Sequence, residues 1–197
     1  MPQEQLTQVI ETIPQLHIKK WKDHDIEMLF KLCYWCAWRM GEAVRLKAED
    51  FDLSTHEVYL GKTKTEREDY ASIPPMFLAE LESYLKDKTG PLFPKLNLQI
   101  VGIWINRLGK MLEIPAWTTP QAITGEKTKC HIFRKSIGKD MLYGVHGRKA
   151  PLNVISSTLR HRGKNPLAST SQYLKLGIEG AKDWWYEEKT DTDQLII

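Results

Sequence analysis

Six residues spread along the 197-residue chain have side chains suited to chemistry on a phosphodiester. Guanidinium groups grip a phosphate with paired donors, lysine and histidine side chains move protons, and a tyrosine hydroxyl can attack phosphorus. In chain order the six are Arg39, Lys64, His131, Arg134, His161 and Tyr173, with His131 and Arg134 joined in the string HIFR. This set predicts transfer of a nucleic-acid strand.

The strings around these residues carry more information than the single residues do. They read WRMGEAVRLKAEDFD at 38–52, VYLGKTKTEREDYASIP at 58–74, HIFRKS at 131–136 and STLRHRGKNPLASTSQYL at 157–174. In this order they resemble the catalytic domain of the tyrosine recombinase, or phage integrase, family, over roughly residues 25–175. The resemblance implies an α+β fold that is mainly helical with a small antiparallel sheet or hairpin.

The resemblance also implies an activity. Members of this family cut and rejoin double-stranded DNA at specific sites through a covalent 3′-phosphotyrosine intermediate, without metal, cofactor or ATP, and they assemble as tetramers on DNA. The family's first arginine precedes a Glu and a Leu-x-x-x-Asp segment, matched by Arg39, Glu42, Leu46 and Asp50. Its HxxR motif corresponds to His131 and Arg134. A chain with these matches is expected to be a recombinase or integrase.

Three of the carried-over residues have competitors or departures from the family pattern. Lys64 fits the family's hairpin lysine best, and Lys62 is the alternative. The family places a Gly just before its next His, whereas Arg160 precedes His161 here, and the insert GKNP lengthens the path to the tyrosine. Tyr173 is preferred as nucleophile over two other tyrosines, Tyr143 and Tyr186, because it follows Thr170 in a Thr-x-x-Tyr string within a polar, flexible stretch.

Basic residues are concentrated in one part of the chain. Residues 127–175 contain eleven basic side chains and a single acidic one, Asp140, although the net charge is only +3. Such a segment is typical of a surface that contacts a phosphate backbone, and a solvated charged face is the alternative interpretation. The residues expected to contact DNA are Lys62, Lys127, Lys129, Lys135, Arg160, Arg162 and Lys164.

Local patterns predict the elements that must position these side chains. Apolar periodicity predicts helices at 3–13, 23–40, 42–47, 75–86 and 98–112, a helix opening at His131, and another whose face includes Val154, Ile155 and Leu159. Asp23 is expected to cap the second helix, and Arg39 falls at its far end. Two short strands, 56–60 and 70–73, predict a hairpin with the lysines near its tip. Residues 115–129 are predicted to form a loop.

Length, composition and cysteine content indicate one compact domain in a reducing compartment. The chain has three cysteines, and the CYWC string at 33–36 fits a helix core better than a zinc or redox site. With no membrane span or secretory signal in the sequence, we expect an intracellular protein, cytoplasmic or wherever the host genome lies.

The predicted division is a lead-in helix at 1–24, a catalytic domain at 25–176 and a tail at 177–197 that docks on a neighbouring protomer or packs on its own domain. Because family members usually carry a separate N-terminal DNA-binding domain, the chain is expected to be a catalytic fragment or a minimal form. It should bind DNA weakly and with strong salt dependence.

Three other functions remain open. A type IB topoisomerase uses the same covalent chemistry to relax DNA, and a catalytically silent relative would bind DNA without cutting it. A metal-dependent nuclease built on His131 and His161 is the third, and resistance to EDTA would argue against it.

Overall fold

The computed structural model describes residues 3–62, 68–118, 131–161 and 164–174. The helices are α1 (Gln3–Thr12), α2 (Asp23–Trp35), α3 (Met40–Ala43), α4 (Pro75–Leu85), α5 (Leu98–Met111), α6 (Pro115–Thr118), α8 (His131–Tyr143), α9 (Leu152–Thr158) and α10 (Pro166–Leu174). Short 3-10 helices lie at Ile13–Leu16 and Ala48–Asp50. The strands are β1 (Phe51–Asp52), β2 (Glu57–Lys62) and β3 (Glu68–Ser72). The mainly helical fold with a small antiparallel sheet confirms the predicted fold class.

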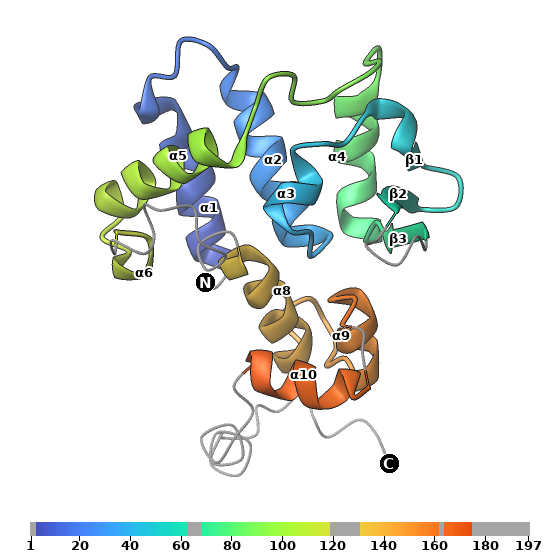
Figure 1. Cartoon of the computed structure of the whole chain (residues 1–197). Coiled ribbons are helices and arrows are strands. Elements are labelled where there is room, and N and C mark those ends of the chain that lie inside the picture. The colour runs from blue at the N-terminus through green and yellow to red at the C-terminus, as the bar shows by residue number, and fades with distance from the viewer. Residues whose placement is uncertain (1–2, 63–67, 119–130, 162–163, 175–197) are drawn as a thin grey trace.

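Helix α2 forms the centre of the molecule, with α1 and α5 on one side and α4 and the sheet on the other (Figure 1). Seven of its thirteen residues are buried, and they cover most of the circumference of the helix. A helix that is apolar on most of its circumference is stable in water only when other elements enclose it. On the α4 side, Lys31 adds an ion pair with Glu80 at 2.6 Å. Helices α3 and α8, which follow or carry the candidate arginines Arg39 and Arg134, pack directly on α2.

Helix α2 ends earlier than the sequence predicts. Its last residue is Trp35, and Ala37 then adopts a left-handed backbone conformation with a φ of 53°. This conformation stops the helix and leaves Arg39 in extended backbone as the N-cap of α3. The predicted short helix at 42–47 is accordingly shifted to Met40–Ala43. Because the left-handed turn breaks the helix, Arg39 lies on a loop and not on a helix.

The predicted hairpin is present. The strands lie in the order β1-β2-β3, all antiparallel, with Val58 opposite Ala71 and Tyr59 opposite Tyr70. Alternate residues of β3 face inward, so the acidic Asp69 shares the buried face with Ala71. The hairpin tip that carries Lys64 lies outside the described residues.

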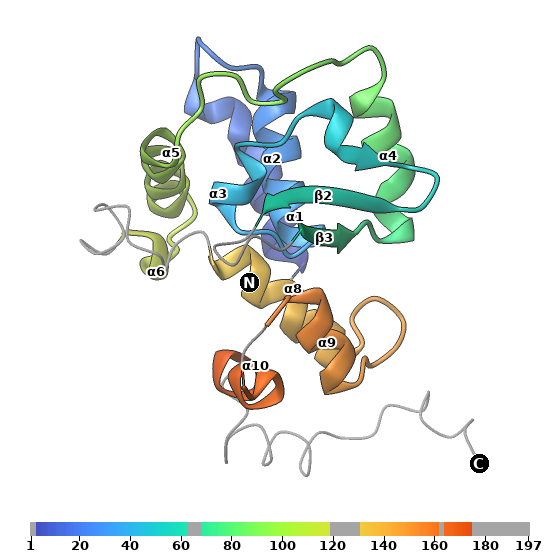
Figure 2. The ribbon, with the colours of Figure 1, turned by 45° about the vertical axis from the view of Figure 1, so that its right-hand side comes forward.

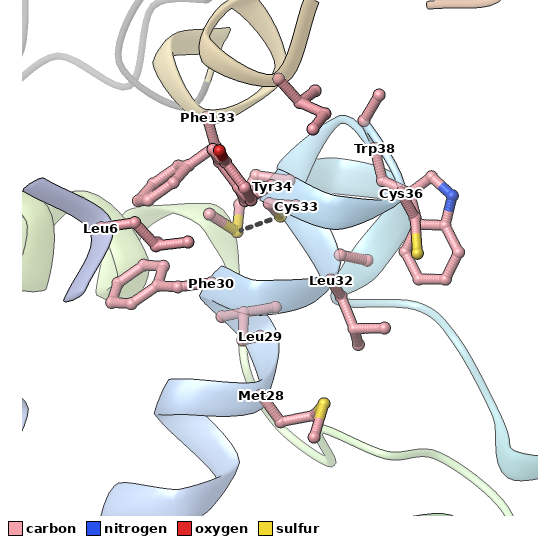
Figure 3. Packing of buried hydrophobic residues seen from close by; sticks show 14 of the residues in the cluster. Leu6, Met28, Leu29, Phe30, Leu32, Cys33, Tyr34, Cys36, Trp38 and Phe133 are labelled. Atoms are coloured by element: carbon pink, nitrogen blue, oxygen red, sulfur yellow. Dashed lines mark hydrogen bonds between the residues drawn. The ribbon is translucent and has the colours of Figure 1, made fainter. Parts of the chain in front are cut away.

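Helices α8, α9 and α10 form a compact group below the sheet and α2 (Figure 2). Phe133 of α8 stacks on Phe30 of α2 with ring centroids 5.2 Å apart. Figure 3 shows the two rings gathered with Leu6 beside α2. Helix α10 and the end of α9 come close to α8 at Gly138, where an added Cβ would lie 3.1 Å from Leu174 and 3.2 Å from Leu159. A glycine at this point allows the three helices to pack closely.

Tyr173 lies in a helix, not in the flexible polar stretch that the sequence predicts. Asn165 accepts a hydrogen bond from the backbone of Ala168 at 3.0 Å, and Pro166 begins α10. An Asn cap followed by a Pro at the first helical position is a helix start signal. The insert GKNP therefore includes the start of a helix.

Smaller differences concern single residues. Asp23, the expected cap of α2, is its first residue, and Lys22 is the cap. Residues 115–118 form α6 within the predicted loop. On the predicted face of α9, Ile155 and Leu159 are buried but Val154 is exposed. Cys33 and Cys36 are buried, as the core interpretation predicted. Within the described ranges, no helix has the length and apolar character that a membrane span requires.

Candidate functional site

Arg39 is presented on the surface beside the start of α3. Its side chain is 46% exposed, and its Nη1 donates to Oε1 of Glu42 at 2.7 Å. The backbone N–H of Arg39 donates to Oε2 of the same carboxylate at 2.8 Å. A capping interaction of this kind satisfies an orphan donor at the helix start. The direction of the Arg39 guanidinium is therefore set by Glu42.

Arg134 lies on the first turn of α8 and is only 1% exposed. Its Nη1 donates to the backbone carbonyl of Ala37 at 2.7 Å, across 97 residues of sequence. The left-handed turn at Ala37 makes this carbonyl available, because the carbonyl lies beyond the end of α2 and takes no part in the regular hydrogen bonds of that helix. The HIFR helix is thereby fixed against the segment that leads to Arg39.

His131 and Tyr173 are described by their backbones only. His131 is the first residue of α8, as the sequence predicts, so its position and that of Arg134 are one turn apart on the same helix. Tyr173 is the penultimate residue of α10. Their assignment to the site remains a proposal from the family resemblance.

His161 follows α9 and contacts α10. Its Nδ1 lies 2.8 Å from the hydroxyl of Thr170, and that hydroxyl donates its single proton to the Pro166 carbonyl at 2.9 Å. Thr170 must then accept the hydrogen bond, so Nδ1 carries the proton and Nε2 is the basic nitrogen of the neutral ring. This assignment comes from the hydrogen-bond network. The helix that contains Tyr173 thus orients the imidazole of His161.

Arg160 differs most from its expected role. It was predicted to contact DNA, but its side chain is 5% exposed and paired with two carboxylates. Its Nη2 donates to Oε2 of Glu42 at 2.5 Å, and its Nη1 donates to Oδ2 of Asp69 at 2.9 Å. A guanidinium enclosed between two protein carboxylates is not presented to a phosphate. The departure from the family's Gly was the only sequence signal of this arrangement.

The charges around Glu42 affect its ionisation. Burial raises the pKa of Glu42, but the charge and hydrogen bond of Arg160, together with the bonds from Arg39, outweigh burial and hold the pKa below its usual value. Burial raises the pKa of the neighbouring Cys36 thiol, and the charge of Arg160 offsets only part of that rise. The carboxylate is therefore charged at neutral pH while the thiol is protonated.

The remaining predicted DNA contacts are only partly described. Lys135 is half-buried on α8 and Lys164 is exposed just before α10. Lys62 ends β2, and the structure describes its backbone alone. Four predicted residues lie outside the described residues: Lys64, Lys127, Lys129 and Arg162.

The structure brings together strings that are far apart in the sequence. Arg160 of the fourth string contacts Glu42 of the first and Asp69 of the second. Arg134 of the third string contacts Ala37, the residue just before the first string. Searched over its described ranges, the chain contains no group of three His, Cys, Asp or Glu side chains placed to hold a metal ion. Among the described residues, the contacts of the candidate site join Arg39 and Arg160 through Glu42, and Arg160 to Asp69.

No protein-family model matches the chain, and no curated protein sequence matches it. Solved structures do. A crystal structure of XerA recombinase aligns with a TM-score of 0.65 and 18% identity, covering 96% of this chain and 65% of that one. XerH site-specific recombinase bound to palindromic difH substrate, a post-cleavage complex, aligns with a TM-score of 0.63 and 20% identity, covering 95% and 52%.

A pre-cleavage complex of XerH with difH substrate aligns with a TM-score of 0.61 and 18% identity, covering 96% of this chain and 52% of that one. The chain thus has the fold of the tyrosine recombinase catalytic domain. It spans between half and two thirds of the length of these recombinases.

Proposed function

We propose that this chain cuts and rejoins double-stranded DNA as a site-specific recombinase, through a covalent 3′-phosphotyrosine intermediate. The observation that carries the proposal is the hydrogen bond from Arg134 to the Ala37 carbonyl, because it joins the HIFR helix to the segment of Arg39. These are the two strings that supply the phosphate-binding arginines in the family resemblance. The likeness to recombinases whose structures contain difH substrate supports DNA as the partner.

The two arginines of this mechanism differ in their exposure to solvent before DNA binds. Arg39 is half exposed and meets a non-bridging phosphate oxygen directly. Arg134 donates one of its five N–H groups to the Ala37 carbonyl, and other N–H groups meet the phosphate in the DNA complex. Both guanidiniums then stabilise the negative charge that gathers on phosphorus-bound oxygens in the transition state.

The covalent step uses the remaining candidate residues. The Tyr173 hydroxyl attacks phosphorus, the bond from phosphorus to the 5′ oxygen breaks, and a 3′-phosphotyrosine forms. Because a phenol has a pKa near 10, a base must take its proton, and Nε2 of His161 or the ring of His131 is suited to do so. The departing 5′ oxygen takes a proton from Lys64, or from Lys62. Attack by another strand's 5′ hydroxyl reverses the step without ATP.

Self-association as a tetramer on DNA belongs to the same proposal. Basic side chains of residues 127–175 supply contacts to the phosphate backbone, whose strength falls as salt rises. The tail at 177–197, which lies outside the described residues, is proposed to dock on a neighbouring protomer. The same segment packing on its own domain is the alternative.

The test is covalent capture of DNA by the chain at low salt. A nicked duplex that releases a short 5′-hydroxyl strand after cleavage traps the adduct, which is counted on a denaturing gel. Wild type and Tyr143→Phe are expected to form the adduct, including in EDTA, and Tyr173→Phe is expected to form none. Tyr143 is a matched control because it is an exposed tyrosine at the end of α8.

Each other outcome supports a different function. DNA binding without any adduct supports the catalytically silent relative. An adduct with plasmid relaxation and no strand exchange supports a type IB topoisomerase. Cleavage that leaves no adduct and stops in EDTA supports a metal-dependent nuclease.

A further inference from the structure

Arg160 occupies a backbone position that favours glycine. It is the first residue beyond the C-cap of α9, with a φ of 47°. Its N–H donates to the Ser157 carbonyl at 2.9 Å, and the N–H of His161 donates to the Ser156 carbonyl at 3.0 Å. This is the Schellman pattern of helix ends, in which the left-handed residue is usually Gly because it lacks a Cβ. An arginine there needs a compensating interaction from its side chain.

The side chain supplies that interaction through two carboxylates on different elements. One guanidinium nitrogen binds Glu42, on α3, and another binds Asp69, on β3. Glu42 uses Oε2 for Arg160 and Oε1 for Arg39. A continuous series of ion pairs therefore runs from the sheet to the exposed guanidinium, in the order Asp69, Arg160, Glu42, Arg39.

These contacts connect segments that otherwise pack loosely. A cavity of about 260 Å³ lies between β3 and α9, lined by Tyr70, Ser72, Asn153 and Ser157 among others, with Arg160 and Cys36 in its wall. Arg160 spans from the end of α9 to Asp69 beside this cavity. Asp69 is the second described residue after the hairpin tip of 63–67, which carries Lys64. The position of the hairpin relative to α9 thus depends on this pair.

We propose that Arg160 is a positioning residue that holds Arg39, the β2–β3 hairpin and His161 in one arrangement for DNA cleavage. Arg160 does not touch the substrate. It acts through Glu42 on Arg39, through Asp69 on the hairpin, and through the chain on His161, its neighbour in sequence. This inference rests on the proposed recombinase function and assigns a role that the family's Gly at this position does not have.

The first experiment separates positioning from DNA contact. Arg160→Gln and the control Arg107→Gln are compared for single-turnover cleavage at saturating nicked duplex, and for duplex affinity across a salt series in a Tyr173→Phe background. Arg107 is an exposed arginine of α5. Because small misplacements of reacting groups cost about 100-fold in rate, Arg160→Gln is expected to cleave about 100-fold more slowly, and Arg107→Gln as fast as wild type.

Affinity and its salt dependence are expected to stay the same in Arg160→Gln, because a buried guanidinium releases no counterions from DNA. A loss of affinity with a shallower salt dependence would instead make Arg160 a phosphate contact and overturn the inference. An unchanged cleavage rate overturns it as well.

The second experiment separates the side chain from the backbone. Arg160→Gly relaxes the left-handed backbone and removes both ion pairs, so it is the variant expected to fold even if Arg160→Gln does not. It is expected to cleave slowly, and Arg160→Lys to recover part of the rate through one pair. Cleavage by Arg160→Gly at or above the wild-type rate would show that the backbone alone matters and overturn the inference.

The third measurement needs no DNA. Hydrogen exchange of the β3 amides is expected to rise about tenfold or more in Arg160→Gly and to stay unchanged in Arg107→Gln, since loss of the link to α9 favours local opening. Unchanged exchange in β3 rejects the positioning role even if the wild type forms no adduct. Raised exchange with no adduct from wild type would reject the recombinase function and keep the link between β3 and α9.

Discussion

The interface of α2 with α8 and the junction of β3 with α9 hold neighbouring parts of the candidate site by different interactions. At the first, Phe30 stacks on Phe133, and Trp117 lies 5.6 Å from Phe133 between ring centroids. At the second, a cavity separates the elements and Arg160 reaches across to Asp69. Apolar burial fixes one region, and two ion pairs fix the other.

The difference indicates a division of labour between the two regions. Apolar packing is short-ranged, insensitive to salt and pH, and largely formed wherever the core is intact. A buried ion pair depends on the charge state of both partners, and breaking one partner leaves the other uncompensated. The α8 helix, with Arg134, is thus held by the core, whereas the arrangement of Arg39 and the hairpin depends on charge.

Phe133→Ala is expected to have the largest effect on stability. Removal of a fully buried ring that packs on two aromatic side chains should cost about 4 kcal/mol of unfolding free energy, with little dependence on pH between 5 and 8. Urea denaturation measures this loss. Ile103→Ala, at an exposed position of α5, is the control and should change stability by less than about 0.5 kcal/mol. Equal losses in both variants would contradict the picture of an α2–α8 core.

Arg160→Met is expected to cost about 3 kcal/mol at neutral pH, because Glu42 and Asp69 lose their buried partner. The pKa of Glu42 is lowered in the folded wild type. Its pairing therefore stabilises the folded state at pH values above the ordinary pKa of Glu, and this stabilisation is lost as the pH falls through the lowered pKa. In the variant, burial raises the pKa of Glu42 instead, and only Arg39 opposes the rise.

The deficit of Arg160→Met should therefore shrink as the pH falls below about 5, where Glu42 takes up a proton. Urea denaturation from pH 3.5 to 8 measures it, with Arg107→Met as the control for loss of one charge. A deficit that is constant over this range would mean that Arg160 stabilises the fold by packing of its aliphatic part. Cys36, which also lies near Arg160, stays protonated throughout because its pKa is raised.

Tyr34→Phe tests a polar contact inside the apolar region. The Tyr34 hydroxyl donates to Oδ2 of the buried Asp140 on α8, and it lies 3.3 Å from Nε2 of His146. Its removal should cost about 1–2 kcal/mol, less than either change above, because one hydrogen bond is lost from a carboxylate. Tyr70→Phe is the matched control, since its hydroxyl donates to Glu68 at an exposed site at 3.1 Å. A control that loses as much as Tyr34→Phe would argue against a contribution from burial.

Arg39→Ala is expected to have the smallest effect on stability and a large one on cleavage. Its ion pair with Glu42 is half exposed, so the loss should be about 0.5 kcal/mol or less. Cleavage should fall by about 1,000-fold, since a guanidinium that stabilises transition-state charge is lost. Arg45→Ala, an exposed neighbour that donates to the Gly41 carbonyl, should cleave normally. Normal cleavage by Arg39→Ala would remove Arg39 from the proposed site.

Much of the local structure could be predicted from patterns along the chain. Helices α4 and α5, the hairpin and the start of α8 at His131 lie close to where periodicity and turn signals predict them. Such elements are set by residues within a few positions of one another. The predicted end of α2 was wrong because apolar residues continue to Trp38, and the left-handed turn at Ala37 has no sequence marker such as Gly or Asn.

The sequence by itself determined which residue types are available for phosphodiester chemistry, their order, and the helices and strands that carry them. Tertiary structure alone decided that Arg134 donates to the Ala37 carbonyl and that Arg160 is buried between Glu42 and Asp69. Each of these contacts joins residues about 90 to 120 positions apart. A basic residue in a basic segment looks the same in sequence whether it faces solvent or a carboxylate. Only the packing of distant elements, which exclude water from one guanidinium and expose another, makes the distinction.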